Sequence, residues 1–214
     1  MPSTGPDTVW TVLAPVKRLD AAKTRLSTRT ASERRALALA FAVDTVHAAL
    51  ACEEVGRVVA VTDDDEVRAA MERLGAAWTP DTSDEDLNGA VLAAADRLLD
   101  DEPGQSFAVL VADLPALRGE ELRRALRIAA SHDRAFVADS AGTGTTLLTA
   151  KAGVPIDPRF GPRSRAAHAA SGAVPIEPGP VPGLRRDVDT EVDLWDAGRL
   201  GLGQATAAIL GTEQ

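Results

Sequence analysis

The stretch Val9–Val16 (VWTVLAPV) decides the fold that we predict for this chain. It is an unbroken apolar run rich in β-branched residues, which is typical of a buried strand. A basic loop follows, and the apolar residues of Ala31–Ala51 then recur every three or four positions, as on one face of a helix. The chain therefore begins with a strand, a loop and a long helix.

Strands and helices continue to alternate after this first unit. Asp63–Asp65 are predicted to form a turn and the cap of the next helix. The expected strands are Arg57–Thr62, Ala76–Thr79, Ser106–Val111, Ala135–Ala138 and Thr145–Ala150, and the expected helices include Val67–Leu74, Leu87–Leu98 and Glu120–Ala130. Such alternation predicts a three-layer, Rossmann-like α/β fold, with helices on both faces of a mostly parallel, mixed sheet. The Gly- and Pro-rich stretch 142–183 is expected to form loops over one sheet edge and part of a substrate pocket.

Length and composition narrow the class of protein. With 214 residues, 45% of them hydrophobic, residues 1–214 are expected to form a single domain, with residues 1–8 flexible. Lys and Arg total 23 against 32 Asp and Glu, and the net charge of -9 argues against binding to nucleic acid or to an anionic membrane. One cysteine, no signal peptide and no long apolar run predict a cytoplasmic protein.

The basic loop within Ala14–Leu26 (APVKRLDAAKTRL) is the first candidate site. It brings Lys17, Arg18, Lys23 and Arg25 to the end of the first strand of an acidic protein. Ligands of open α/β sheets bind beyond the carboxyl ends of the strands, so this loop is placed to receive a polyphosphate. The alternative is a solvated surface loop. The segment matches neither the P-loop nor the Gly-x-Gly-x-x-Gly pattern.

Acidic residues follow in two later segments. Asp113 comes directly after an apolar strand, and Asp187 and Asp189 are two residues apart in GLRRDVDT. Magnesium is bound by one or two carboxylates together with substrate phosphates, so these residues are candidate ligands, with either Asp187 or Asp189 completing the site. Alternatively, Asp113 caps the next helix, and Asp189 or Thr190 caps the helix through Leu194.

Two loops of small residues, GTGTTLL from Gly142 and DPRFGPRS up to Ser164, are the remaining candidates. Glycine allows a backbone to approach an anion closely, although ordinary tight turns would show the same residues. The histidines are interpreted as structural: His47 within a helical stripe, His132 beside a helix end and His168 in a surface helix.

Six separated motifs, taken in order, resemble one family. They are PVKRLDAAKTRL, DLN, VADLPAL, FVADSAGTGTTLL, FGPRS and LRRDVDT, and the similarity runs from about Val9 to Leu200. The family is the 2-phospho-L-lactate and phosphoenolpyruvate guanylyltransferases of coenzyme F-420 biosynthesis. The resemblance implies a nucleotidyltransferase fold, GTP as donor, Mg²⁺ as cofactor and a phosphorylated three-carbon acid as acceptor. It also implies a downstream transferase as the partner that consumes the product.

The resemblance also implies roles for individual residues. Those that match the motifs are Thr145, Gly161 and Ser164 for the acceptor, Asp113 and Asp187 for the metal, Lys17, Lys23 and Arg25 for the triphosphate, and Leu87 and Asn88 for the nucleoside. The form of the FVAD and FGPxS segments favours phosphoenolpyruvate over 2-phospho-L-lactate, and 3-phosphoglycerate is a third candidate. The same fold could also belong to a transferase acting on a molybdopterin or a sugar phosphate, or to a nucleotide-binding protein without activity.

Overall fold

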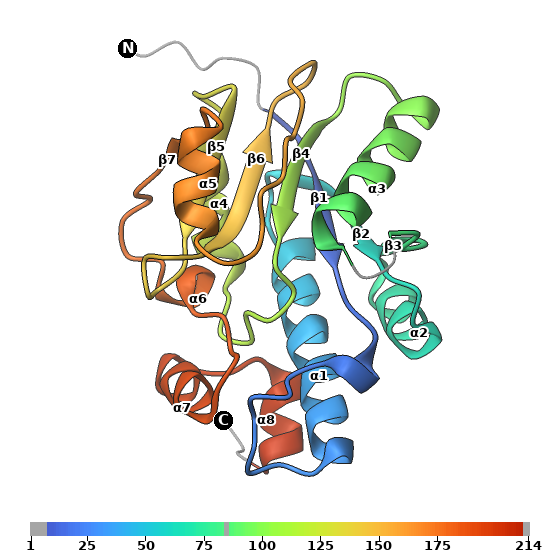
Figure 1. Ribbon diagram of the computed structural model, residues 1–214, viewed down its shortest axis with the longest axis vertical. Helices are drawn as coiled ribbons and strands as arrows, with labels where there is room; N and C mark the ends of the chain where they lie inside the picture. The colour runs from blue at the N-terminus through green and yellow to red at the C-terminus, as the bar shows by residue number, and fades with distance from the viewer. Residues whose placement is uncertain (1–7, 84–85, 212–214) are drawn as a thin grey trace.

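A mixed seven-stranded sheet forms the centre of the computed structural model, which describes residues 8–83 and 86–211 (Figure 1). Residues 1–8 are expected to be flexible, and of these only residue 8 lies within the described residues. The strands are β1 (Trp10–Pro15), β2 (Val55–Val61), β3 (Ala77–Thr79), β4 (Ser106–Leu110), β5 (Arg134–Ala138), β6 (Thr145–Ala150) and β7 (Val174–Pro175). Six of these were predicted, with ends that agree to within two residues; β7 is too short and too exposed to leave a pattern.

The strand order is β3-β2-β1-β4-β6-β5-β7. β6 pairs antiparallel with β4 and β5, whereas every other neighbouring pair is parallel. The predicted mostly parallel, mixed sheet is therefore confirmed. Because β6 runs antiparallel to β4, the first residue of β6 lies at the end of the sheet where β1 and β4 have their carboxyl ends.

Helices cover both faces of this sheet, which confirms the predicted three layers (Figure 1). The helical elements are the 3-10 helix η1 (Leu19–Ala21) and the α-helices α1 (Ala31–Leu50), α2 (Asp65–Leu74), α3 (Leu87–Asp101), α4 (Gly119–Ala129), α5 (Ser164–Ala170), α6 (Pro182–Arg185), α7 (Glu191–Leu200) and α8 (Gln204–Leu210). Residues of α1, α2 and α4 share one apolar cluster, and those of α3 belong to the cluster on the other face. None of the helices in the described ranges is long and apolar enough to span a membrane.

Local signals explain where the main helices begin. Thr30 and Glu33 form a capping box before α1, in which each side chain bonds to the other's backbone amide. Asp64 accepts hydrogen bonds from Glu66 N and Val67 N, so the predicted cap of α2 is confirmed. These caps satisfy backbone donors that have no partner within the first helical turn.

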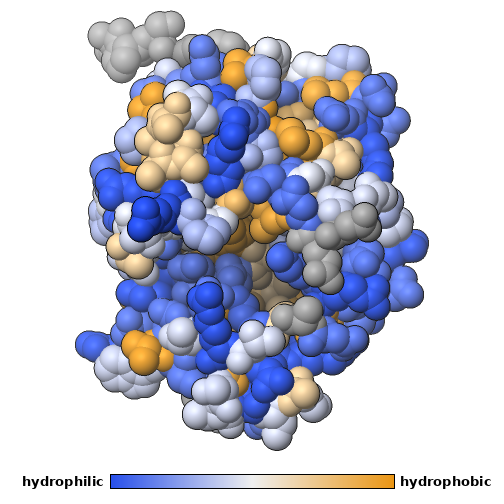
Figure 2. Space-filling model, in the orientation of Figure 1, coloured by the Kyte–Doolittle hydropathy of each residue, from blue (hydrophilic) through white to orange (hydrophobic). Residues whose placement is uncertain are grey.

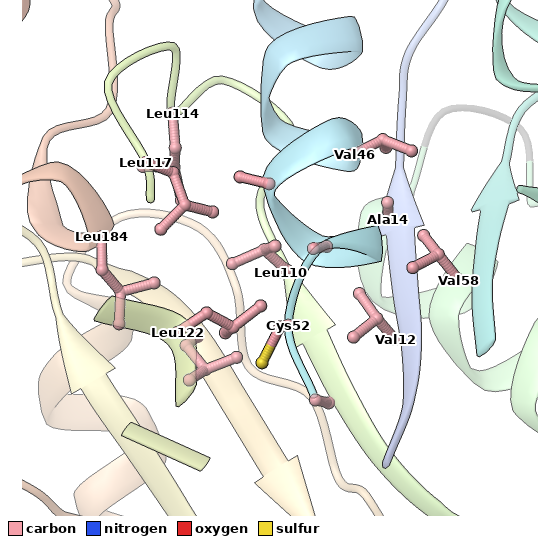
Figure 3. Close-up of a cluster of buried hydrophobic side chains, with 14 of the residues drawn as sticks. Val12, Ala14, Val46, Cys52, Val58, Leu110, Leu114, Leu117, Leu122 and Leu184 are labelled. Atoms are coloured by element: carbon pink, nitrogen blue, oxygen red, sulfur yellow. The ribbon is translucent and has the colours of Figure 1, made fainter. Parts of the chain in front are cut away.

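Alternate residues of each central strand enter opposite cores. Val12 and Ala14 of β1 face Val46 of α1 together with Val58 of β2 and Leu110 of β4 (Figure 3). Leu13, Val59 and Val109 point to the other face, where α3 packs. A sheet covered on both faces needs apolar residues at successive positions, which is why the central strands are continuous apolar runs. A third cluster joins α1 to α7 and α8.

Candidate functional site

A cavity of about 320 Å³ lies beyond the carboxyl ends of β1 and β4. Its charged lining residues are Lys17, Lys23, Asp113, Asp187 and Asp189, and apolar residues such as Val16 and Leu87 complete it. Figure 2 shows a hollow in the middle of the viewed face, with hydrophobic residues in its depth and hydrophilic residues around it. The two predicted charged regions thus meet in one pocket, which is the position that an open α/β sheet offers a ligand.

Lys23 is the cation at the centre of this pocket. Its Nζ lies 2.5 Å from Asp113 Oδ2 and 3.1 Å from Asp189 Oδ1. Burial lowers the pKa of Lys23, but the charges of Asp113 and Asp189 outweigh burial and raise it overall. The backbone of Lys23 is left-handed, with φ 54°, a conformation that is costly for a residue with a side chain and is tolerated where surrounding contacts compensate.

The rest of the basic loop is more exposed. Arg25 is 75% exposed and reaches Asp189 at 3.5 Å, and Arg18 pairs with Asp63 at 3.2 Å. Lys17 is exposed and lines the cavity. The loop is therefore a solvated surface in part, but Lys23 turns inward, which the plain surface-loop alternative does not predict.

Asp113 faces the cavity and does not cap the next helix, whose N-cap backbone N–H donates to Glu121 instead. The residue before α4 is Arg118, so the alternative that Asp113 caps this helix is wrong. Asp113 Oδ2 accepts from Lys23, whereas Oδ1 is buried and has no hydrogen-bond partner among the residues that the structure describes. An unsatisfied buried carboxylate oxygen is costly, so this atom is suited to a cation from solution.

A backbone contact brings the second acidic segment to Asp113. Val188 is fully buried in the third apolar cluster, and its N–H donates to Asp113 O at 3.0 Å. Its neighbours Asp187 and Asp189 both line the cavity, while Thr190, one of the two predicted candidates, caps α7. Burial, and next the charge of Asp113, raise the pKa of Asp187 to about 7. For Asp187, nearby positive charge therefore does not offset the cost of burial and of the neighbouring carboxylates.

These residues fit magnesium as carboxylate ligands that leave coordination positions to phosphates and water. The unpartnered Asp113 Oδ1 and the raised pKa of Asp187 both indicate a place that a cation would stabilise. Among the residues that the structure describes, no group of three or more His, Cys, Asp or Glu side chains is arranged to hold a metal by itself. Magnesium would accordingly need substrate oxygens in addition to protein ligands.

The predicted acceptor residues lie near one another, at the same end of the sheet as the cavity. Thr145 is the first residue of β6, and Ser164, the first residue of α5, is 3% exposed. Arg165 N donates to Thr143 O at 3.1 Å, and Ser164 N to Gly161 O at 3.1 Å. Gly161 has φ 128°, and open space surrounds the position where a Cβ would lie. The two small-residue loops are thus joined at the start of α5.

His168 connects these loops and was misplaced by the sequence interpretation. It was expected in a surface helix, but it is 0% exposed. Its Nδ1 lies 2.9 Å from Thr145 Oγ1, and its Nε2 accepts from Arg159 N at 2.8 Å. One sequence signal could have indicated this burial: His168 is four residues after Ser164, a spacing that places both residues on one face of a helix.

Asn88 ties α3 to the second loop. Its Nδ2 donates to Phe160 O at 3.0 Å, and its Oδ1 accepts from Phe160 N at 2.7 Å. Leu87 lines the cavity, whereas the polar atoms of Asn88 bond to the loop before Gly161; that both lie near the nucleoside stays a prediction.

Asp139 and Arg185 connect the two halves of the site and were not singled out from the sequence. Buried Asp139 accepts from Thr143 N at 2.9 Å, and its charge also contributes to raising the pKa of Asp187. Arg185 donates to Ala138 O at 3.0 Å and to Asp139 O at 3.1 Å. The cavity thus offers cations to a polyphosphate, and Asp139 and Arg185 join it to the loop that precedes Thr145.

Known proteins match this chain over most of its length. A model of the family described as "Guanylyl transferase CofC like" matches residues 10–170. The phosphoenolpyruvate guanylyltransferase of Salinispora arenicola is 50% identical over 208 residues, covering 95% of this chain and 94% of that protein. The corresponding protein of Thermomonospora curvata is 48% identical over 205 residues, covering 94% and 88%.

The fold has solved counterparts as well. A 4-diphosphocytidyl-2C-methyl-D-erythritol synthase superposes with a TM-score of 0.63 at 12% identity, covering 90% of this chain and 99% of that one. At this identity the likeness concerns the fold alone, and it confirms the nucleotidyltransferase architecture. The family match and the curated relatives confirm the resemblance drawn from the six motifs. This chain belongs to the CofC-like guanylyl transferase family.

Proposed function

We propose that this protein transfers the GMP unit of GTP to phosphoenolpyruvate, giving enolpyruvyl-diphospho-5'-guanosine and diphosphate. The similarity to phosphoenolpyruvate guanylyltransferases over nearly the whole chain carries the choice of substrates. The cavity supports it independently, because it combines lysines for a polyphosphate with carboxylates for a divalent cation. The product would enter coenzyme F-420 biosynthesis and be consumed by a downstream transferase.

Each half of the site has its own task in this proposal. Lys17, Lys23 and Arg25 receive the triphosphate, and Thr145, Gly161 and Ser164 hold the acceptor. Leu87 packs near the nucleoside, and Asn88 keeps the acceptor loop against α3. Asp113 and Asp187, with Asp189 beside them, would hold Mg²⁺. When bound there, the ion supplies positive charge at the phosphates.

The reaction needs no side-chain nucleophile. A phosphate oxygen of phosphoenolpyruvate forms a bond to the α-phosphorus of GTP, while the bond from this phosphorus to the bridging oxygen breaks and diphosphate leaves with its electron pair. The attacking phosphate is already ionised at neutral pH, so positioning and charge stabilisation supply most of the acceleration. Lys23 can serve the leaving diphosphate, because its Nζ already lies within the cavity.

Diphosphate release tests the proposal. GTP, ATP and CTP are each paired with phosphoenolpyruvate, 2-phospho-L-lactate and 3-phosphoglycerate, with Mg²⁺ and with EDTA. We expect the fastest release from GTP with phosphoenolpyruvate, and none in EDTA. A preference for 2-phospho-L-lactate would show that it is the acceptor in place of phosphoenolpyruvate. The absence of turnover with every pair would exclude the proposed activity.

Replacing Asp113 tests the metal assignment. Asp113→Asn keeps the shape of the side chain and removes the charge, so we expect turnover with Mg²⁺ to fall by roughly 10²–10³-fold. Circular dichroism should show an unchanged fold. Asp96→Asn on exposed α3 is the matched control and should keep the normal rate. A near-normal rate for Asp113→Asn would refute the assignment.

A further inference from the structure

His168 is a buried imidazole with a hydrogen bond at each ring nitrogen. Nε2 lies 2.8 Å from Arg159 N and Nδ1 lies 2.9 Å from Thr145 Oγ1. A backbone N–H can only donate, so Nε2 has to accept. The proton of a neutral imidazole then resides on Nδ1, from which it is donated to Thr145 Oγ1.

The surroundings keep this ring neutral. Burial, and next the positive charge of Arg134, lower the pKa of His168 to about 4; Arg159 acts in the same direction and Asp157 opposes them. Protonation would place a second N–H opposite Arg159 N–H, so the geometry also disfavours the charged ring. Near neutral pH a single tautomer, with the proton on Nδ1, satisfies both contacts.

This tautomer determines what the Thr145 hydroxyl can do. Its oxygen accepts a hydrogen bond from His168 Nδ1–H, and among the described residues no other side-chain hydrogen bond to this hydroxyl exists. The hydroxyl hydrogen is therefore left to donate. A hydroxyl donor that is linked through His168 to the loop before Gly161 is suited to an anionic oxygen, such as one of a phosphate or a carboxylate.

The same ring supports the loop that carries Gly161. Arg159 and Phe160 directly precede this glycine, and the Phe160 ring packs edge-on against His168 with centroids 5.0 Å apart. Asn88 of α3 bonds to both backbone polar groups of Phe160. His168 thus sets the position of the loop and the direction of the Thr145 donor together.

We propose that His168 is a positioning residue for the acceptor: through Nδ1 it makes Thr145 a hydrogen-bond donor to the anionic group of the acceptor, and through Nε2 it holds the loop before Gly161. This inference rests on the proposed function, because that function assigns the acceptor to Thr145 and Gly161. It gives His168 no proton-transfer step in the reaction. Its effect should appear in acceptor binding and leave nucleotide binding unchanged.

Two substitutions separate the two contacts. In His168→Gln the amide oxygen can replace Nε2 and the bond to Thr145 is lost; in His168→Asn the amide nitrogen can replace Nδ1 and the bond to Arg159 is lost. We expect each to raise the acceptor KM roughly tenfold, as for one buried hydrogen bond. The Kd of Mg·GTP, measured calorimetrically without acceptor, should change less than about twofold, well below one such bond.

A double-mutant cycle tests whether His168 acts through Thr145. If it does, adding His168→Gln to Thr145→Val should raise the acceptor KM little beyond Thr145→Val alone. Thr149→Val is the matched control: Thr149 lies on the same strand, and the substitution likewise removes a buried hydroxyl, one that donates to Ala135 O. It should lower the thermal midpoint and leave the acceptor KM unchanged. His168 variants that behave like this control would overturn the inference.

The tautomer provides a readout independent of activity. Long-range ¹H–¹⁵N spectra of histidine-labelled wild-type protein should show His168 protonated at Nδ1, and a proton on Nε2 would contradict the proposal. If His168 variants fail to fold, Thr145→Ser against Thr145→Val tests the donor hydroxyl: the acceptor KM should rise only for Thr145→Val, and equal KM values would overturn the inference. Lack of wild-type turnover refutes the proposed function and the acceptor role with it. Normal wild-type turnover with unchanged acceptor KM in folded His168 variants refutes only the positioning role.

Discussion

Asp187 illustrates at the residue scale how a binding site can cost stability. Its folded pKa is about 7 against an ordinary value of 3.8, because burial and then Asp113 disfavour the charged form. A raised pKa stabilises the fold while the proton is bound, fully below the unfolded value, and this contribution is lost as pH rises through about 7. At pH 8 the ligand-free protein therefore contains a poorly stabilised carboxylate.

We accordingly expect Asp187→Asn to stabilise the ligand-free protein at pH 8, on the order of 2 kcal/mol, and by much less at pH 5. Urea unfolding without Mg²⁺ at both pH values measures the difference. Asp96→Asn, on the exposed side of α3, should show no such pH dependence. An Asp187→Asn variant that is less stable than wild type at pH 8 would contradict this account of the pocket.

Some features of single residues can be predicted from the neighbouring sequence, and others depend on distant parts of the chain. Lys23 and Asp113 could be selected from the sequence because each follows the end of a predicted strand. The packing of distant segments decides that Lys23 turns inward with a left-handed backbone, and that Asp113 Oδ1 has no partner within residues 8–83 and 86–211. The environment of His168 was missed for the same reason, since its partners are 23 and 9 residues away.

At the scale of elements, Asp44 joins the first long helix to the last. It is a buried carboxylate within α1 and accepts from Ala205 N and Thr206 N, both at 2.9 Å, at the start of α8. A carboxylate here satisfies backbone donors and interacts favourably with the helix dipole, although it belongs to another element. The alanine-rich composition of α8 alone does not explain its position.

Replacing Asp44 with Ala should therefore cost about 1–2 kcal/mol of unfolding free energy and loosen α8, with little change in turnover. Urea unfolding gives the free energy, and hydrogen exchange of the α8 amides locates the effect. Asp44→Asn retains one acceptor oxygen and should lose less. Unchanged stability in Asp44→Ala would show that the contact contributes nothing.

Helices and strands with a long apolar pattern could be predicted from the sequence, and very short ones could not. The apolar period of α1 and the continuous apolar runs of β1 and β4 result from burial against the sheet, so they are visible in sequence. β7 has two residues and α6 has four, and both form through contacts with other elements. No local period can reveal such segments.

At the scale of the whole molecule, the apolar clusters share their elements. Val12 and Leu13 of β1 belong to clusters on opposite faces of the sheet, and α1 contributes to both the first and the third cluster. One cluster cannot lose its packing without exposing residues of another. The prediction of a single domain therefore has a direct physical test.

We expect one cooperative unfolding transition, with calorimetric and van't Hoff enthalpies that agree. Mg·GTP at 100 times its Kd should add about 2.7 kcal/mol of stability while preserving one transition. Mg·ATP at the same concentration is the control and should add less. Two resolved transitions would show that the clusters unfold separately and would refute the single domain.

The sequence by itself determined the order of the longer strands and helices along the chain, the α/β class and the family, because these depend on local periodicity and on motifs that are contiguous in the chain. Tertiary structure alone decided that Lys23 lies between Asp113 and Asp189, that Asp187 has a raised pKa and that His168 joins two loops. Burial and charge at a site are summed over groups far apart in sequence. Only the folded chain brings those groups within reach of one another.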